Sequence, residues 1–169
     1  MGRLLQLTPR LQMLDVYNCD LHIPEMLQAA GEETLSHLRI LDLGGYNTDP
    51  QLSISDSLPS MPHLQALSVS HCAGDDDHIQ VHNLLRLVAS LPPSLTHLNV
   101  SNITFLPSVL EVVQQKERLV QLHRLNIGRR QDVDDVDAIR EEVQQLNPDV
   151  QVYCDLRDRL WQMDEDVNI

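Results

Sequence analysis

Aromatic residues are scarce in this sequence of 169 residues, where Phe, Trp and Tyr together make up only 3%. Leu alone accounts for about 17%, roughly twice its ordinary share of a protein. This balance disfavours a β-sandwich with an aromatic core. It favours a repeat protein whose core is built on leucine.

Basic residues are also few. The chain has 12 Lys and Arg against 25 Asp and Glu, which gives a formal net charge of -13. A groove that binds phosphate groups would have to work against the field of the whole protein. We therefore expect neither a nucleic acid nor an anionic membrane surface as the partner.

The sequence has no long apolar run. The longest lies within residues 84–89, whereas a membrane span needs ~20 apolar residues. Polar residues and Pro9 interrupt residues 1–11, so this segment does not resemble a signal peptide. Three cysteines, Cys19, Cys72 and Cys154, are an odd number without the paired spacing of metal sites, which favours reduced thiols. We expect a cytoplasmic protein, with a nuclear location as the alternative.

Leucine recurs in a fixed pattern. Residues 11–21 read LQMLDVYNCDL and match the leucine-rich repeat template L-x-x-L-x-L-x-x-N/C-x-L at every fixed position, with Val16 in place of one Leu. Looser copies begin at Leu38, Leu64, Leu95 and Leu122, and a degenerate sixth begins at Asn147. Successive copies start 27, 26, 31, 27 and 25 residues apart, mostly within the range known for this repeat.

The repeat predicts the fold class. We expect an α/β protein in the form of a leucine-rich repeat solenoid of about six repeats, as a single domain over residues 1–169. Parallel strands should form its concave face, and helices and loops its convex face. Residues 1–10 are interpreted as the tail of a preceding repeat, and residues 153–169 as a C-terminal capping helix and an acidic tail.

The segments between the predicted strands are expected to differ from one another. Apolar residues at helical spacing predict convex helices over residues 24–30, 78–90, 107–119 and 134–146. Prolines and serines within residues 47–62 predict only a loop or a short 3-10 turn there.

The variable positions of the repeat are expected to face solvent on the concave side, in three columns. The first column is Asp15, Asp42, Ser68, Asn99, Asn126 and Gln151. The second is Tyr17, Gly44, Ser70, Ser101, Gly128 and Tyr153, and the third is Asn18, Gly45, His71, Asn102, Arg129 and Cys154. The middle of this surface is small and polar, between a basic patch at one end (Arg124, Arg129, Arg130) and apolar and acidic residues at the other (Met13, Asp15, Tyr17).

A protein partner laid along such an arc could be oriented by this gradient. The candidate partner-binding residues are Asp15, Tyr17, Asp42, Ser68, His71, His97, Asn99, Asn102, Arg124, Asn126 and Arg129. The alternative, that these are only solvated strand positions, stays open.

Several patterns could support catalysis or metal binding, but they are less specific than the leucine repeat. His78 and His82 are four residues apart on a predicted helix, a spacing that lets two imidazoles share a metal, but no third ligand is evident. The Asp, Ser and His residues of neighbouring strands (Asp42, Ser68, Ser70, His71, His97) could be drawn as a catalytic triad. An open concave surface offers neither a desolvated pocket nor oxyanion donors, so we expect no enzyme, no cofactor and no metal.

Two of the cysteines occupy a structural position of the template. Cys19 and Cys72 stand at its Asn/Cys position, which points inward, and a buried thiol behaves as a small apolar group. Cys154 falls one position earlier in its repeat and is expected to be more exposed, with a redox role as an open alternative.

The repeats resemble the intracellular leucine-rich repeat class with convex helices, as in ribonuclease inhibitor and the F-box receptors, over nearly the whole chain. Residues 113–135, together with 147–152, also look like the last repeats of the Zyg-eleven and Zer-type substrate receptors of cullin-RING ubiquitin ligases. That second resemblance implies a receptor that presents substrates to a ligase. The sequence has no F-box and no elongin-binding Leu-x-x-x-Cys box, so no ligase-binding residue is carried over.

Together these features predict a non-catalytic protein–protein interaction module. Its partner would be an unidentified protein, and the resemblance adds subunits of a ubiquitin ligase. The alternative is a leucine-rich repeat scaffold or an inhibitor-like regulatory protein unrelated to ubiquitin.

Overall fold

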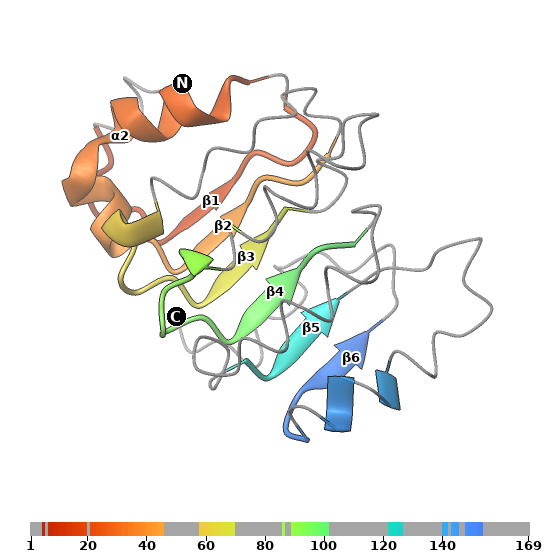
Figure 1. Ribbon diagram of the computed structural model, residues 1–169. Helices are drawn as coiled ribbons and strands as arrows, with labels where there is room; N and C mark the ends of the chain where they lie inside the picture. Colours follow the sequence, from red (N-terminus) through yellow and green to blue (C-terminus); the bar gives the residue numbers. More distant parts are fainter. Residues whose placement is uncertain are drawn as a thin grey trace.

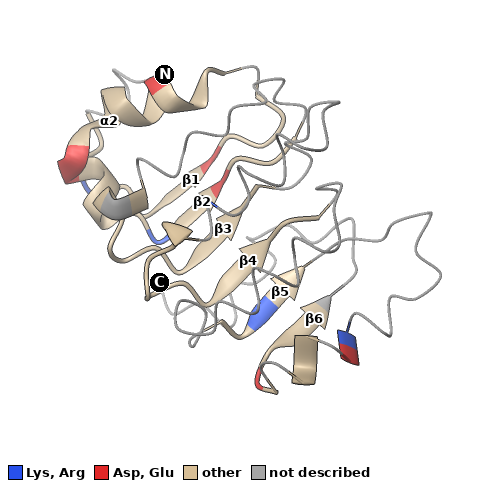
Figure 2. Cartoon of the chain, in the orientation of Figure 1, with Lys and Arg blue, Asp and Glu red and all other residues tan. Residues whose placement is uncertain are grey.

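Parallel strands, placed side by side in chain order, form the framework of the molecule (Figures 1 and 2). The computed structural model describes residues 5, 7–19, 21–45, 58–69, 86, 89–101, 122–126, 140–141, 143–145 and 148–153. Its strands are β1 (Met13–Asp15), β2 (Ile40–Asp42), β3 (Ala66–Ser68), β4 (His97–Asn99), β5 (Arg124–Asn126) and β6 (Gln151–Tyr153). They form one six-stranded parallel sheet, so the chain is an α/β protein whose strand order is that expected of a solenoid.

The register of the sheet repeats from one strand to the next. Each strand pairs with its neighbour through its central residue, which places one row of aliphatic residues across the sheet: Leu14, Leu41, Leu67, Leu98, Leu125 and Val152. The predicted alignment is correct for the first five copies and wrong for the sixth. Val152 pairs with Leu125, so Asp149, not Asn147, holds the place of Leu122. In the other copies a leucine begins the repeat and identifies the register. Here a proline and polar residues stand in its place, so the sequence does not identify the register.

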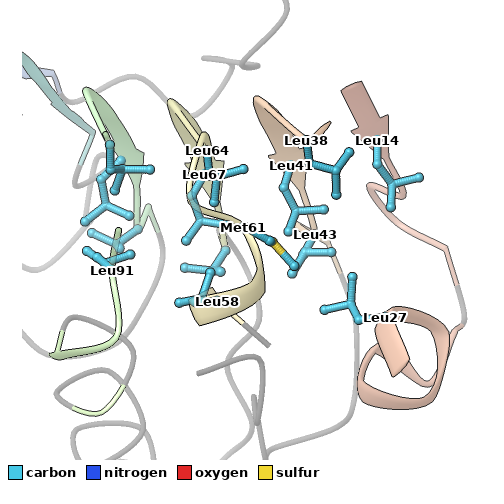
Figure 3. Close-up of a cluster of buried hydrophobic side chains, with 14 of the residues drawn as sticks. Leu14, Leu27, Leu38, Leu41, Leu43, Leu58, Met61, Leu64, Leu67 and Leu91 are labelled. Carbon is cyan, nitrogen blue, oxygen red and sulfur yellow. The ribbon is translucent and has the colours of Figure 1, made fainter. Parts of the chain in front are cut away.

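Behind the sheet lies one continuous aliphatic core. The central row of the strands shares it with a second row, Val16, Leu43, Val69 and Val100, which directly follows the strands. Leu58, Met61 and Leu64 enter it from the segment before β3, and Figure 3 shows the Met61 side chain reaching toward Leu43. A core of unbranched and branched aliphatic residues explains why so few aromatic residues suffice.

The helix α2 (Ile23–His37) covers the first two strands on the core side (Figure 1). Pro24 stands at its first turn, where a missing amide costs nothing, and Ile23, Met26 and Leu27 are buried. The predicted helix over residues 24–30 is therefore confirmed but too short. Gly31 (φ 79°, ψ 160°) breaks the helical geometry, and the chain resumes the helix beyond it to reach His37.

The turns after Gly31 have a packing role. Thr34 and Leu35 are both buried, and the Thr34 hydroxyl donates a hydrogen bond to the carbonyl of Leu5 at 3.3 Å. Leu5 is helical and buried, whereas Leu7 is 81% exposed. The second part of α2 thus fixes the segment that leads into β1.

The other convex segments are described in part. A 3-10 helix, η2 (Leu58–Ser60), lies within the segment where only a loop or such a turn is predicted. Arg86 and Ala89 are helical within the predicted 78–90 helix, as are residues 140–141 and 143–145 within 134–146. The predicted helix over 107–119 lies outside the described residues, and so does all of the predicted cap beyond Tyr153. In the part of the chain that the structure describes, no helix is both long and apolar enough to cross a bilayer.

The central row predicts where the fold is most sensitive. Leu67→Ala should lower the free energy of unfolding by about 2–5 kcal/mol, because Leu67 is fully buried and its removal leaves a cavity. Chemical denaturation measures the change. Leu7→Ala removes the same atoms from an exposed position and should change stability by less than about 0.5 kcal/mol. Equal losses in the two variants would contradict the placement of the core.

Candidate functional site

The face of the sheet opposite the core carries the candidate residues. Because side chains alternate along a strand, the residues that flank the central row point to this face in two columns. Column A is Met13, Ile40, Ala66, His97, Arg124 and Gln151. Column B is Asp15, Asp42, Ser68, Asn99 and Asn126, and Tyr153 holds the corresponding register position on β6.

The register places five predicted residues together and corrects one assignment. Asp15, Asp42, Ser68, Asn99 and Asn126 do form one column, as predicted. Gln151 was assigned to this column and belongs instead beside Arg124 in column A, while Tyr153 takes its place. The error follows directly from the two-residue shift of the sixth copy.

The expectation that these columns face solvent is wrong for the middle of the sheet. Residues predicted to be exposed are buried there: Asp42, Ser68, His97, Asn99, Ser101 and Asn126 are between 1% and 5% exposed. At the two ends the face is more open. Asp15 on β1 is exposed, and Tyr17 and Arg124 are half-buried. The accessible candidates therefore lie at the ends of the sheet and not at its centre.

Column B has a structural task that explains its composition. The Oδ1 atom of Asp15 accepts a hydrogen bond from the amide of Tyr17 at 2.9 Å. Asp42 does the same for Gly44 at 2.9 Å, and Asn99 for Ser101 at 3.0 Å. An Asp or Asn side chain that binds the amide two residues on is a standard way to turn the chain out of a strand. These side chains close the turns after β1, β2 and β4, where either Asp or Asn can supply the acceptor oxygen.

Column A differs from the predicted small and polar surface. Met13, Ile40 and Ala66 form an apolar cluster of their own on this face, separate from the main core. Beyond it, His97 is buried and its Nδ1 atom lies 2.7 Å from the hydroxyl oxygen of Thr96. The column then continues to the cation of Arg124. Sequence reasoning named Met13 at this end but missed Ile40 and Ala66, because its columns contained no residue that precedes a central leucine.

The segments that follow β1 and β2 are in close backbone contact with each other. Asn18 has a positive φ of 56°, and its amide donates to the carbonyl of Gly44 at 2.7 Å. Gly45 has φ 112°, and a Cβ there would overlap the backbone nitrogen of Asn18 and lie 2.6 Å from its Cα. Glycine is required at this position by both conformation and space.

Other predicted residues are placed only in part. His71, Asn102 and Arg129 lie outside the described residues, as do His78, His82, Cys72 and Cys154. Cys19 is half-buried against the aliphatic core, in agreement with a structural role. Among the described residues, no three His, Cys, Asp or Glu side chains gather to hold a metal ion. Ser68 and His97 fall in different columns, and the Asp42 carboxylate is engaged in its turn.

Comparisons with known proteins add little to this description. No family model and no curated protein matches the sequence. Among solved structures, the C-terminal domain of tropomodulin, from structural genomics of Caenorhabditis elegans, matches with a TM-score of 0.48 and 12% sequence identity, over 95% of this chain and 86% of that one. At that identity and score the similarity carries no conclusion about function.

The turn role of column B can be tested at Asp42. Asp42→Ala should lower the free energy of unfolding by about 1–3 kcal/mol, because the amide of Gly44 loses its acceptor in a buried site. Asp42→Asn keeps the acceptor, as Asn99 does on β4, and should cost less. Asp15→Ala, at an exposed turn where water replaces the lost acceptor, should cost less than about 1 kcal/mol. Thermal unfolding compares the three variants, and an Asn variant as unstable as the Ala variant would contradict this role.

Gly45 offers a second test, with Gly31 as its matched control. Both have a positive φ, so an alanine at either costs about 1–3 kcal/mol of backbone strain. At Gly31 no atom lies within 4 Å of the added Cβ, whereas at Gly45 the backbone of Asn18 would have to move. We expect Gly45→Ala to be the more destabilising in denaturant titrations. The reverse order would show that the two chain segments are not in contact.

Proposed function

We propose that this chain is a leucine-rich repeat solenoid of about six repeats that binds a protein partner and carries out no catalysis. The observation that carries the proposal is the in-register parallel sheet, in which one strand follows the next in chain order. Such an arrangement provides a long surface from short strands, and solenoids use extended surfaces of this kind for binding. The leucine template of the sequence fits the same architecture.

The ends of the outward face are the parts best suited to contact a partner. Asp15 and Tyr17 lie at the β1 end, and Arg124 lies on β5. Figure 2 shows acidic colour on β1 and basic colour on β5. Opposite charges at two separated points orient a partner along the sheet and disfavour the reversed orientation. Buried residues between them, such as Asp42 and Asn99, support the surface and do not touch the partner.

A role as the repeat region of a ubiquitin-ligase substrate receptor is the more specific form of this proposal. It rests on the resemblance of residues 113–135 and 147–152 to the Zyg-eleven and Zer-type receptors. A scaffold or inhibitor-like regulator without a link to ubiquitin is the alternative form. Both forms place the protein in the cytoplasm or nucleus.

Affinity purification from a cytosolic extract, followed by mass spectrometry, tests the proposal. The bait should be compared with a double variant, Tyr17→Ala with Arg124→Ala, which leaves the turns of column B intact. Gln144→Ala with Gln145→Ala is the matched control, since both residues are exposed and lie in a helical segment outside the sheet. We expect a stable partner that binds the original chain and the control at least about tenfold more tightly than the double variant, a difference of ~1.4 kcal/mol.

The outcomes separate the forms of the proposal. A partner retained equally by all three baits would contradict binding through the ends of the outward face. Cullin or elongin subunits among the retained proteins would support the receptor form. A partner set without any ligase subunit would favour the scaffold or regulator.

A further inference from the structure

Basic side chains gather where the chain enters the strands. The residues that lead into β1 to β5, described over 8–12, 36–39, 61–65, 93–96 and 122–123, form the entry rim of the sheet. These described residues include no Asp or Glu, although the whole chain has 25 acidic residues against 12 Lys and Arg. The basic side chains of the rim are Arg10, His37, Arg39, His63 and His123.

The register of the sheet aligns these side chains. The residues three places before the first residue of β1, β2 and β3 hold equivalent positions, and all three are basic: Arg10, His37 and His63. Arg39 and His123 stand directly before β2 and β5. Arg39 is half-buried and the other four are exposed, so a partner can reach the rim.

The backbone of the rim is hydrogen-bonded from repeat to repeat. The amide of Arg39 donates to the carbonyl of Gln12 at 2.7 Å, and the amide of Gln65 to the carbonyl of Arg39 at 2.8 Å. Thr96 donates in the same way to Gln65, and His123 to Thr96, both at 2.8 Å. These bonds fix the spacing of the basic residues before a partner arrives, which reduces the entropy lost on binding. Because these amides are already bonded, recognition depends on the side chains.

Acidic side chains lie at the other end of the strands. Asp15 and Asp42 end β1 and β2, and the described residues that follow the strands include no Lys or Arg. A strand of three residues is about 10 Å long, so a wide polyanion on the rim would also approach the exposed carboxylate of Asp15. The described rim residues include no Phe, Trp or Tyr on which the bases of a single strand could stack. The rim therefore favours a narrow anion with carboxylate groups over a nucleic acid.

We propose that the entry rim binds an acidic segment of a partner protein, with Arg10 and Arg39 as the main donors to its carboxylates. An arginine offers paired N–H groups whose geometry matches a carboxylate. β1 and β5 are four strand spacings apart, about 19 Å, which an extended segment of about six residues spans. This surface differs from the outward face proposed above and adjoins it at Arg124.

Fluorescence anisotropy with a labelled hexaglutamate peptide tests the proposal. We expect saturable binding to the unaltered chain that weakens as the ionic strength rises from about 0.05 M to about 0.5 M. Arg10→Gln with Arg39→Gln should raise the Kd at least about tenfold, because charge-assisted hydrogen bonds are lost. Arg86→Gln with Arg140→Gln is the matched control, since it changes the net charge equally from helical positions outside the rim. The control should change the Kd by less than about twofold.

The outcomes decide whether the rim is the site and which partner it takes. Absence of saturable binding, or equal weakening in the rim variant and the control, would overturn the proposal. A labelled hexathymidylate strand that binds as tightly as hexaglutamate would point to a nucleic acid and would also overturn it. Binding through Tyr17 and Arg124 is measured by the separate purification experiment, so the two proposed surfaces can fail independently.

Circular dichroism checks that the variants are folded. If the rim variant does not fold, the unaltered chain is titrated with hexaglutamate and its amide chemical shifts are followed by NMR. The shifts should move most at Arg10, Arg39, His63 and His123. Changes confined to residues outside the rim would overturn the proposal.

Discussion

The in-register pairing of successive strands is the constraint on which the rest of this molecule depends. Each strand has only three residues, so its central side chain alone enters the core between its two neighbours. A slip of one residue would turn Leu41 or Leu67 outward and bring a polar residue of column B into the aliphatic core. The free energy lost by that exchange at each strand keeps the whole sheet in one register, and side-chain hydrogen bonds hold the turns after β1, β2 and β4 in a shape that fits this register.

Those turns explain much of what first resembles a binding surface. Asp15, Asp42 and Asn99 are the residues that a search for polar candidates selects, and each uses a side-chain oxygen to hold the amide two residues later. A carboxylate and an amide serve equally because only one acceptor atom is needed. Polar residues recurring at repeat spacing thus have two explanations, and hydrogen-bond geometry distinguishes them where periodicity does not.

The sequence predicted the features that follow from local pattern. The leucine spacing predicted the parallel strands and their core-facing residues through Leu125, and the prolines of residues 47–62 predicted the short turn at η2. Its errors have a common origin in long-range structure. A period of two along a strand tells which side chains share a face, yet it does not tell whether that face is covered, so the burial of Asp42 and Asn126 was missed. The sixth register was missed because valine and polar residues replace the leucine marker there.

The end of helix α2 also depends on long-range structure, which the local sequence pattern does not show. Gly31 is a rational place to end a helix, and the prediction stopped at Ala30. The chain continues because Thr34 and Leu35 gain burial, and Thr34 gains the carbonyl of Leu5, a residue far away in the sequence. The low helix propensity of glycine costs about 1 kcal/mol at Gly31, and burying a leucine side chain stabilises the fold by more than that. Tertiary packing therefore decides the boundary, as it decides which polar residues of the sheet remain accessible to a partner.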